Sequence, residues 1–243
     1  MTILFIDMLG VRARWHVGGR ESVEKAFSRF RSIIIEAIQT RNGGRVLHGG
    51  IEADSAAIIC SSAKVAVDVG RNAFRIAFRT ARSPNDERIW LRGVIVPANE
   101  ADPLKTERPL ASDLEQIKVA EYSTALLEAI SAEKSGVKGM RLLIGGGLSK
   151  KDIQRAYGLT IHGEYFCPII RPQTLSYPSR LKGFHDILWM ASGREDKWKE
   201  MQRTMFYRLK WSAANADEFI HAAVTQVLFN SWEAIFESRT TKA

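Results

Sequence analysis

Apolar and polar residues alternate in blocks along the first half of the chain, and the spacing inside each block predicts its secondary structure. Ile3 to Met8 is a short apolar run rich in β-branched residues, which predicts a buried strand that carries Asp7 near its end. From Ser22 to Ile38 apolar residues recur at helical spacing, and Ser22 is a suitable N-cap, so this segment predicts a helix. The glycine-containing stretch between the two is predicted to be a loop.

A hairpin, a second helix and a further strand are predicted next. Residues 45–52 and 55–60 have the composition of two strands, with a tight turn at Ala53-Asp54 between them. Helical spacing returns over residues 62–80, and residues 89–96 form another apolar, strand-like run. The order βαββαβ is that of the ferredoxin-like split βαβ arrangement, an antiparallel sheet with both helices on one face. We therefore expect an α+β fold with a ferredoxin-like βαββαβ core.

The remainder of the chain departs from this alternation. A helix is predicted over residues 112–130 and a short strand over residues 140–144. Beyond Pro172 the pattern changes, and the last third consists of helical segments rich in aromatic residues, with no long low-complexity linker before them. We divide the chain into a core domain of residues 1–175 and a C-terminal helical extension of residues 176–243 that packs on the core.

The composition narrows the class of protein. The 243 residues are 45% apolar and 26% charged, which excludes fibrous and wholly disordered chains. The two cysteines, Cys60 and Cys167, match no disulfide framework or zinc-ligand spacing, and they favour a reducing, cytoplasmic location. No stretch of about 20 apolar residues occurs, so we expect no membrane span. Lys and Arg number 35 against 27 Asp and Glu, and the net charge of +8 favours polyanionic partners such as nucleotides or nucleic acids.

Two acidic residues are the candidates for chemistry. In the expected sheet the first strand and the hairpin are neighbours, so Asp7 and Asp54 would lie at the same edge. Two converging carboxylates suit Mg²⁺ or Mn²⁺, which proteins hold with one or two carboxylates plus substrate phosphates. Aspartate is also favoured in turns, which leaves a structural interpretation open for Asp54 taken alone. A carboxylate inside an apolar run, like that of Asp7, is costly without a partner or a metal.

Three short motifs in residues 3–144 resemble those of class III nucleotide cyclase domains. The run Phe5-Ile-Asp7-Met-Leu-Gly10-Val11 is similar to their FxDIxGF opening, and Glu52-Ala-Asp54 stands where their GD hairpin stands. Leu91-Arg92-Gly-Val-Ile95 resembles the strand that follows their second helix. The resemblance implies that residues 1–175 are a catalytic domain that converts a nucleoside triphosphate to its 3′,5′-cyclic monophosphate and pyrophosphate.

The resemblance also implies roles for individual residues. Two Mn²⁺ or Mg²⁺ ions per site would be held by Asp7, Asp54 and the backbone carbonyl of Met8. Backbone N–H groups would cradle the substrate phosphates at the three residues that follow the first strand, Gly10, Val11 and Arg12. Because the active sites of this family form between two head-to-tail domains, a single-domain chain implies a homodimer with two sites.

The basic and base-selecting positions match the family less closely. Arg92 is the candidate ligand of the β- or γ-phosphate, with an ion pair at the strand edge as the alternative. Gly50 stands at the position that helps to select the purine in adenylyl and guanylyl cyclases, which places it in the substrate pocket. Ala120 and Thr124 replace the Asn and Arg of a later helix, so a substitute is needed, either Lys118 or a basic residue of the last third.

A compact domain that keeps both acids but lacks the purine determinants is most similar to the pyrimidine cyclases of the bacterial Pycsar anti-phage system. Those enzymes make cyclic UMP or cyclic CMP, which a separate effector senses. The resemblance therefore implies a uridylate or cytidylate cyclase, with UTP favoured over CTP, that signals in antiviral defence.

Two other functions fit the sequence. A basic stripe on the second predicted helix would suit a non-catalytic module that binds RNA or DNA through Arg71, Arg75, Arg79 and Arg82. Such a stripe is also typical of a solvated helix face. An adenylyl or guanylyl cyclase would share the metal chemistry of the pyrimidine enzyme and differ only in its base contacts.

Overall fold

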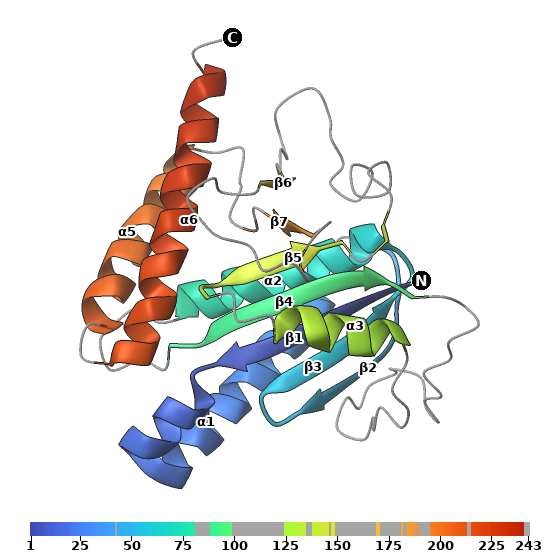
Figure 1. Cartoon of the computed structure of the whole chain (residues 1–243), viewed down its shortest axis with the longest axis horizontal. Helices are drawn as coiled ribbons and strands as arrows, with labels where there is room; N and C mark the ends of the chain where they lie inside the picture. Colours follow the sequence, from blue (N-terminus) through green and yellow to red (C-terminus); the bar gives the residue numbers. More distant parts are fainter. Residues whose placement is uncertain are drawn as a thin grey trace.

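The computed structural model contains a mixed sheet with helices on both faces (Figure 1). It describes residues 1–41, 43–80, 88–98, 124–134, 138–145, 147–148, 169–170, 181, 184–187, 189, 195–212 and 215–240. Its elements are β1 (Thr2–Leu9), α1 (Val11–Gln39), β2 (Val46–Glu52), β3 (Ser55–Cys60), α2 (Ala63–Thr80), β4 (Trp90–Pro97), α3 (Thr124–Glu133), β5 (Arg141–Ile144), β6 (Ile169–Ile170), β7 (His185–Ile187), α5 (Glu195–Ser212) and α6 (Ala216–Thr240).

The strand order confirms the expected α+β fold. The sheet runs β2-β3-β1-β4-β5-β7-β6, and its first four strands have the antiparallel order of the ferredoxin-like βαββαβ core. β1 lies in the middle of this core, paired with β3 on one side and β4 on the other. β5 then adds parallel to β4, and the short strands β7 and β6 extend that edge.

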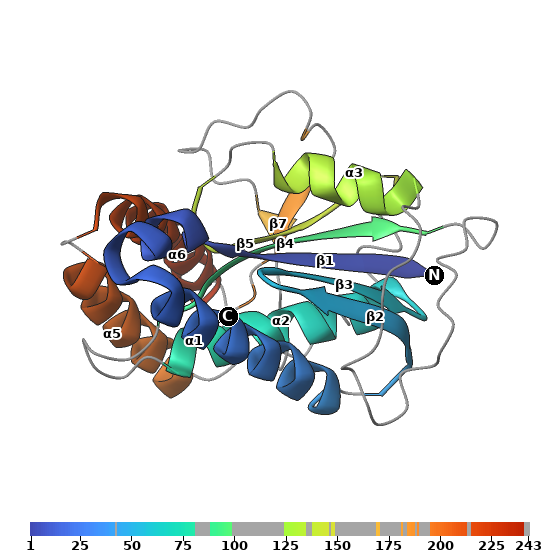
Figure 2. The ribbon, with the colours of Figure 1, turned by 90° about the horizontal axis from the view of Figure 1, so that it is seen from below.

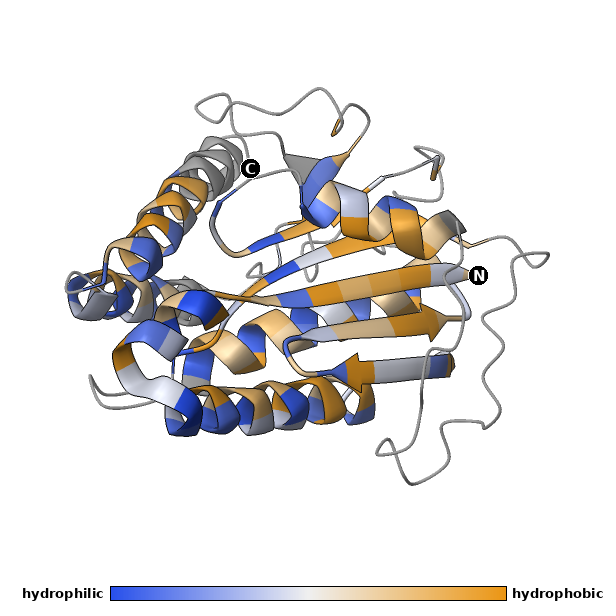
Figure 3. Ribbon diagram, turned by 60° about the horizontal axis from the view of Figure 1, so that its bottom comes forward, coloured by the Kyte–Doolittle hydropathy of each residue, from blue (hydrophilic) through white to orange (hydrophobic). Residues whose placement is uncertain are grey.

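Alternation along β1 separates two apolar cores. Leu4 and Ile6 face the layer of α1 and α2, whereas Ile3 and Phe5 face α3 on the other side of the sheet. Figure 2 shows α3 on one face of the sheet and both α1 and α2 on the other, as predicted for the first two helices. Because side chains alternate, Asp7 shares the α3 face with Phe5. In Figure 3 apolar residues follow the central strands, and polar residues gather where β1 ends.

The start of α1 differs from the prediction. The helix begins at Val11 instead of Ser22, so the predicted loop is wrong over most of its length. Gly10 adopts a left-handed conformation, with φ of 82°, and serves as the N-cap immediately after β1. Only Gly19 leaves the helical conformation, with φ of 61° and ψ of −156°. The helical turns of α1 before Gly19 project beyond the sheet, and Trp15 in them is 54% exposed. Because these turns bury no continuous face, their sequence shows no amphipathic spacing.

The C-terminal segments α5 and α6 pack on the core. α5 and α6 lie side by side (Figure 1), and their apolar residues join the cluster formed by α1 and α2. The ring of Phe78 on α2 lies 5.6 Å from Trp189 and 5.6 Å from Phe229 of α6. β7 also joins the sheet beside β5. The division of the chain at residue 175 stays a prediction, because residues 171–180 lie outside the described part.

Two further expectations concern the middle of the chain and the membrane. The predicted helix over residues 112–130 is described only from Thr124, and α3 continues past the predicted end to Glu133. The predicted strand over residues 140–144 is present as β5. Within the described residues, no helix is both long enough and apolar enough to cross a bilayer.

Candidate active site

The two candidate acids meet at one edge of the core sheet. Asp7 on β1 lies in register with Ser55 of β3, the residue that follows Asp54 at the hairpin turn. The carbonyl oxygen of Asp54 accepts a hydrogen bond of 2.7 Å from the backbone N–H of Met8. Ala53 closes the turn with a positive φ of 46°. The backbone therefore ties the hairpin turn to the end of β1 and brings Asp54 beside Asp7, where the strand order predicted it.

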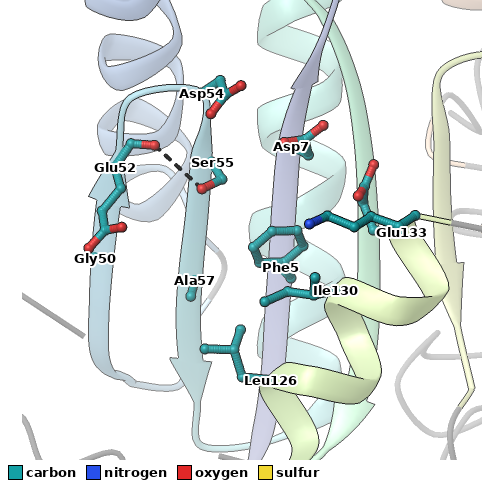
Figure 4. A pocket seen from close by; sticks show the side chains of 11 residues that line it. Phe5, Asp7, Gly50, Glu52, Asp54, Ser55, Ala57, Leu126, Ile130 and Glu133 are labelled. Carbon is teal, nitrogen blue, oxygen red and sulfur yellow. Dashed lines mark hydrogen bonds between the residues drawn. The ribbon is translucent and has the colours of Figure 1, made fainter. Parts of the chain in front are cut away.

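A cavity of about 340 Å³ opens beside these acids, between the sheet and α3 (Figure 4). Its polar end is formed by Asp7, Glu52, Asp54, Ser55, Glu133 and Lys134. Its apolar end is formed by Phe5, Ala57, Leu126 and Ile130. Gly50 of β2 also lines the cavity. The cavity thus presents an acidic end and an apolar end to one ligand.

The acidic end is electrostatically crowded. Burial and the negative charges of Glu133 and Asp54 raise the pKa of Asp7 to about 8, and a hydrogen bond between the Asp7 and Glu133 side chains adds to the rise. The positive charge of Arg92 acts in the opposite direction without reversing it. A carboxylate in this position is stabilised by a cation, because a bound cation relieves both the burial cost and the repulsion.

Arg92 lies next to Asp7 but is engaged by another acid. Arg92 pairs in register with Asp7 across β1 and β4. Its Nε donates a hydrogen bond of 2.7 Å to Glu133 Oε1, and a second guanidinium nitrogen binds the same oxygen. The two side chains are 11% and 4% exposed, so the ion pair is buried instead of lying at the surface. Arg92 is therefore held at the edge of the acidic end by α3.

The predicted phosphate cradle lies at the start of α1. The first-turn N–H groups of a helix attract anions, and α1 has no side-chain cap at Gly10 that would occupy them. Val11 is partly buried and Arg12 is exposed. Gly10 lines a neighbouring cavity of about 580 Å³, between the starts of α1 and α6, and not the acidic cavity itself. The structure thus places this segment beyond the end of β1, three residues from Asp7.

The donor atoms at the acidic end fit a hard divalent cation. Within the described residues, no group of three or more His, Cys, Asp or Glu side chains is arranged to hold a metal ion. Mg²⁺ does not need such a cage, because it is commonly bound by one or two carboxylates together with substrate phosphates. Asp7 and Asp54 provide those two carboxylates on neighbouring strands. The residues present therefore fit the predicted ions.

Sequence reasoning missed the contribution of α3. Leu126, Ile130 and Lys134 follow one another at intervals of four residues, and Glu133 lies beside the last of them. This spacing was the available signal, since it forms one helical stripe that ends in charged residues. The predicted helix ended at Ile130, so it did not include Glu133 and Lys134, the charged residues at the end of this stripe.

The basic stripe on α2 is not the solvated face that its spacing suggested. Arg71 is only 7% exposed, and Arg75 Nε donates a 2.9 Å hydrogen bond to the carbonyl oxygen of Trp189. Arg79 is exposed, and Arg82 lies outside the described residues. The stripe therefore offers no continuous basic surface to a nucleic acid over the residues that the structure describes.

Comparisons with known proteins add a distant likeness of fold. No protein-family model matches the sequence, and no curated protein matches it either. The crystal structure of the adenylyl cyclase CyaB from P. aeruginosa aligns with 14% identity, covering 80% of this chain and 95% of that chain, at a TM-score of 0.42. A likeness this distant carries no weight for function.

Proposed function

We propose that the chain is a metal-dependent nucleotide cyclase that converts a nucleoside triphosphate to its 3′,5′-cyclic monophosphate and pyrophosphate. The observation that carries the proposal is the convergence of Asp7 and Asp54 at the acidic end of a cavity whose other end is apolar. The acidic end suits a metal-bound triphosphate, and the apolar end suits a nucleobase and its ribose. The resemblance of the motifs around both acids to class III cyclases supports the same reaction.

Asp7, Asp54 and the backbone carbonyl of Met8 would hold two Mn²⁺ or Mg²⁺ ions. When bound there, the ions would lower the pKa of the ribose 3′-hydroxyl and neutralise charge on the leaving pyrophosphate. The backbone N–H groups at Gly10, Val11 and Arg12 would bind phosphate oxygens at the start of α1. These contacts would fix the triphosphate, and the ribose would lie toward the apolar end of the cavity.

The reaction is an in-line displacement at the α-phosphorus. The 3′-oxygen forms a new bond to this phosphorus, and the bond from the phosphorus to the bridging oxygen breaks. The pyrophosphate leaves with the bonding electron pair, and the proton of the hydroxyl passes to water. The role of the chain is to align the two oxygens and to stabilise the charge on the leaving group. Arg92 lies beside Asp7, where its guanidinium forms an ion pair with Glu133.

We propose a pyrimidine substrate, with UTP favoured over CTP. Support comes from Gly50, which lines the cavity at the position where purine cyclases of the resembling family carry a base-selecting side chain. A purine cyclase remains the second candidate, because it would use the same acids and the same metal ions. The resemblance to the Pycsar enzymes supports a cytoplasmic homodimer whose cyclic product is sensed by a separate effector in anti-phage defence.

The test is incubation of the purified chain with each of the four nucleoside triphosphates and Mn²⁺, followed by mass spectrometry of the products. We expect a cyclic pyrimidine nucleotide and pyrophosphate. Asp7→Ala and Asp54→Ala are each expected to abolish turnover while the circular dichroism spectrum stays native, because each removes a metal ligand and little core volume. Absence of any cyclic product from the wild-type chain would overturn the proposal.

A further inference from the structure

We propose that Lys134 is a further catalytic residue, the cation that contacts the substrate phosphates in the acidic cavity. This inference rests on the proposed cyclase function and names a residue that carries part of it. It follows from the course of α3 over the sheet and from the charges at the polar end of the cavity. It also follows from the lack of a partner for the Lys134 ammonium among the residues that the structure describes.

The course of α3 places Lys134 at the phosphate end. Leu126, Ile130 and Lys134 are spaced by four residues, and all three line the cavity. Figure 4 shows Leu126 over the apolar end and Ile130 further along, with Glu133 reaching the level of Asp7. Lys134 follows Glu133 directly, so the helix that covers the nucleobase end brings an ammonium group to the acidic end.

Among the described side chains that line the cavity, Lys134 is the cation available to bind a phosphate at the polar end. Four carboxylate residues line the polar end, and Lys134 is the cationic residue among the lining side chains that the structure describes. Arg92 lies at the same edge, but its guanidinium is bound to Glu133. The Lys134 side chain is exposed and forms no hydrogen bond or ion pair within the described part of the chain. Its ammonium can therefore turn to a ligand without breaking an existing contact.

The chemistry of the proposed reaction needs such a group. When the bond from the α-phosphorus to the bridging oxygen breaks, negative charge builds up on the pyrophosphate. An ammonium beside that oxygen stabilises the transition state more than the bound substrate, and so it raises kcat. The resembling cyclases supply this charge from an arginine that is replaced here by Thr124. Lys134, the residue that directly follows α3, supplies it in this chain.

The test compares Lys134→Gln and Lys134→Arg with Lys138→Gln. Lys138 is also exposed and lies four residues further on, but it does not line the cavity. For the triphosphate that the wild type converts, we expect Lys134→Gln to lower kcat about 100-fold, the scale of losing one transition-state charge contact. Lys134→Arg should recover most of this loss, and Lys138→Gln should keep wild-type rates. Because Lys134 is exposed, its variants should unfold at the wild-type temperature.

A binding measurement separates this inference from the proposed function. Calorimetry with Mn²⁺ and the 3′-deoxynucleoside triphosphates, which cannot cyclise, is expected to show weaker binding to Lys134→Gln than to the wild type or Lys138→Gln. Wild-type kcat and wild-type affinity in Lys134→Gln would overturn the role of Lys134 while leaving the cyclase proposal intact. If the wild type makes no cyclic product, the cyclase proposal fails, and the affinities alone decide whether Lys134 contacts a triphosphate.

Discussion

Replacing Asp7 by asparagine is expected to stabilise the fold in the absence of metal and to abolish the proposed activity. Burial and the charges of Glu133 and Asp54 raise the pKa of Asp7 from 3.8 to about 8. In the unfolded chain at pH 7 the carboxyl group is ionised, whereas in the fold it either keeps a proton or is ionised among repelling acids. Both alternatives are unfavourable, so this side chain destabilises the native state.

The magnitude follows from the difference in pKa. Holding a group of pKa 3.8 in its protonated form at pH 7 costs up to about 4 kcal/mol, at 1.36 kcal/mol per pH unit. Asp7 is partly exposed and its neighbours relax, so we expect Asp7→Asn to recover about 1–3 kcal/mol. The raised pKa determines how the contribution of Asp7 to stability changes with pH. The contribution of Asp7 to stability is most favourable below about pH 4, falls as the pH rises to about 8, and is constant above that.

The assay is urea unfolding of the metal-free chain at pH 5, 7 and 8.5. We expect Asp7→Asn to be more stable than the wild type at pH 7 and 8.5, with a smaller gap at pH 5. Addition of Mn²⁺ should raise the stability of the wild type and leave the variant unchanged, because only the wild type keeps the ligand. If Asp7→Asn is clearly less stable than the wild type at pH 8.5, the described crowding of the site is wrong.

The matched control is the same substitution at Asp186. This carboxylate is 1% exposed, and Arg141 binds it with two guanidinium nitrogens, one of them at 2.8 Å. Asp186→Asn leaves the buried Arg141 charge without its carboxylate and is expected to destabilise the fold by about 3–5 kcal/mol. The opposite signs at these two acids distinguish a cluster of repelling carboxylates from a structural ion pair.

Two further predictions concern the surroundings of the site. Gly10→Ala is expected to cost about 1–2 kcal/mol in urea unfolding, because φ of 82° is unfavourable for a residue with a Cβ; an unchanged midpoint would show that α1 starts elsewhere. Glu133→Gln removes a charge that raises the pKa of Asp7, so the pH at which Mn²⁺ binding is half-maximal should fall by about one unit. Calorimetric titrations between pH 6 and 9 would measure this shift, and an unchanged midpoint would mean that Glu133 does not act on Asp7.

The core of the fold was predictable because its signals are local. The apolar run of β1, the hairpin turn at Ala53-Asp54 and the helical spacing of α2 each depend on neighbouring residues alone. From those elements the strand order placed Asp7 beside Asp54. The same approach failed at the start of α1, where the glycines suggested a loop, although only Gly19 breaks the helix.

Long-range contacts account for what the sequence did not predict. The burial of Arg71 on α2 and the bond from Arg75 to Trp189 depend on tertiary packing that helical spacing alone does not report. The roles of Glu133 and Lys134 depend on how α3 crosses the sheet, which no periodicity within α3 specifies. β6 and β7 contain two and three residues, too few for a pattern to identify them as strands.

The central claim is that Asp7 and Asp54 together hold divalent cations beside a bound triphosphate. Crystals grown with Mn²⁺ and a 3′-deoxynucleoside triphosphate allow the ions to be located directly by anomalous scattering. The account predicts Mn²⁺ peaks within roughly 2.0–2.3 Å of carboxylate oxygens from both residues, with the triphosphate in the same cavity. A bound triphosphate whose metal ions contact neither carboxylate would contradict it.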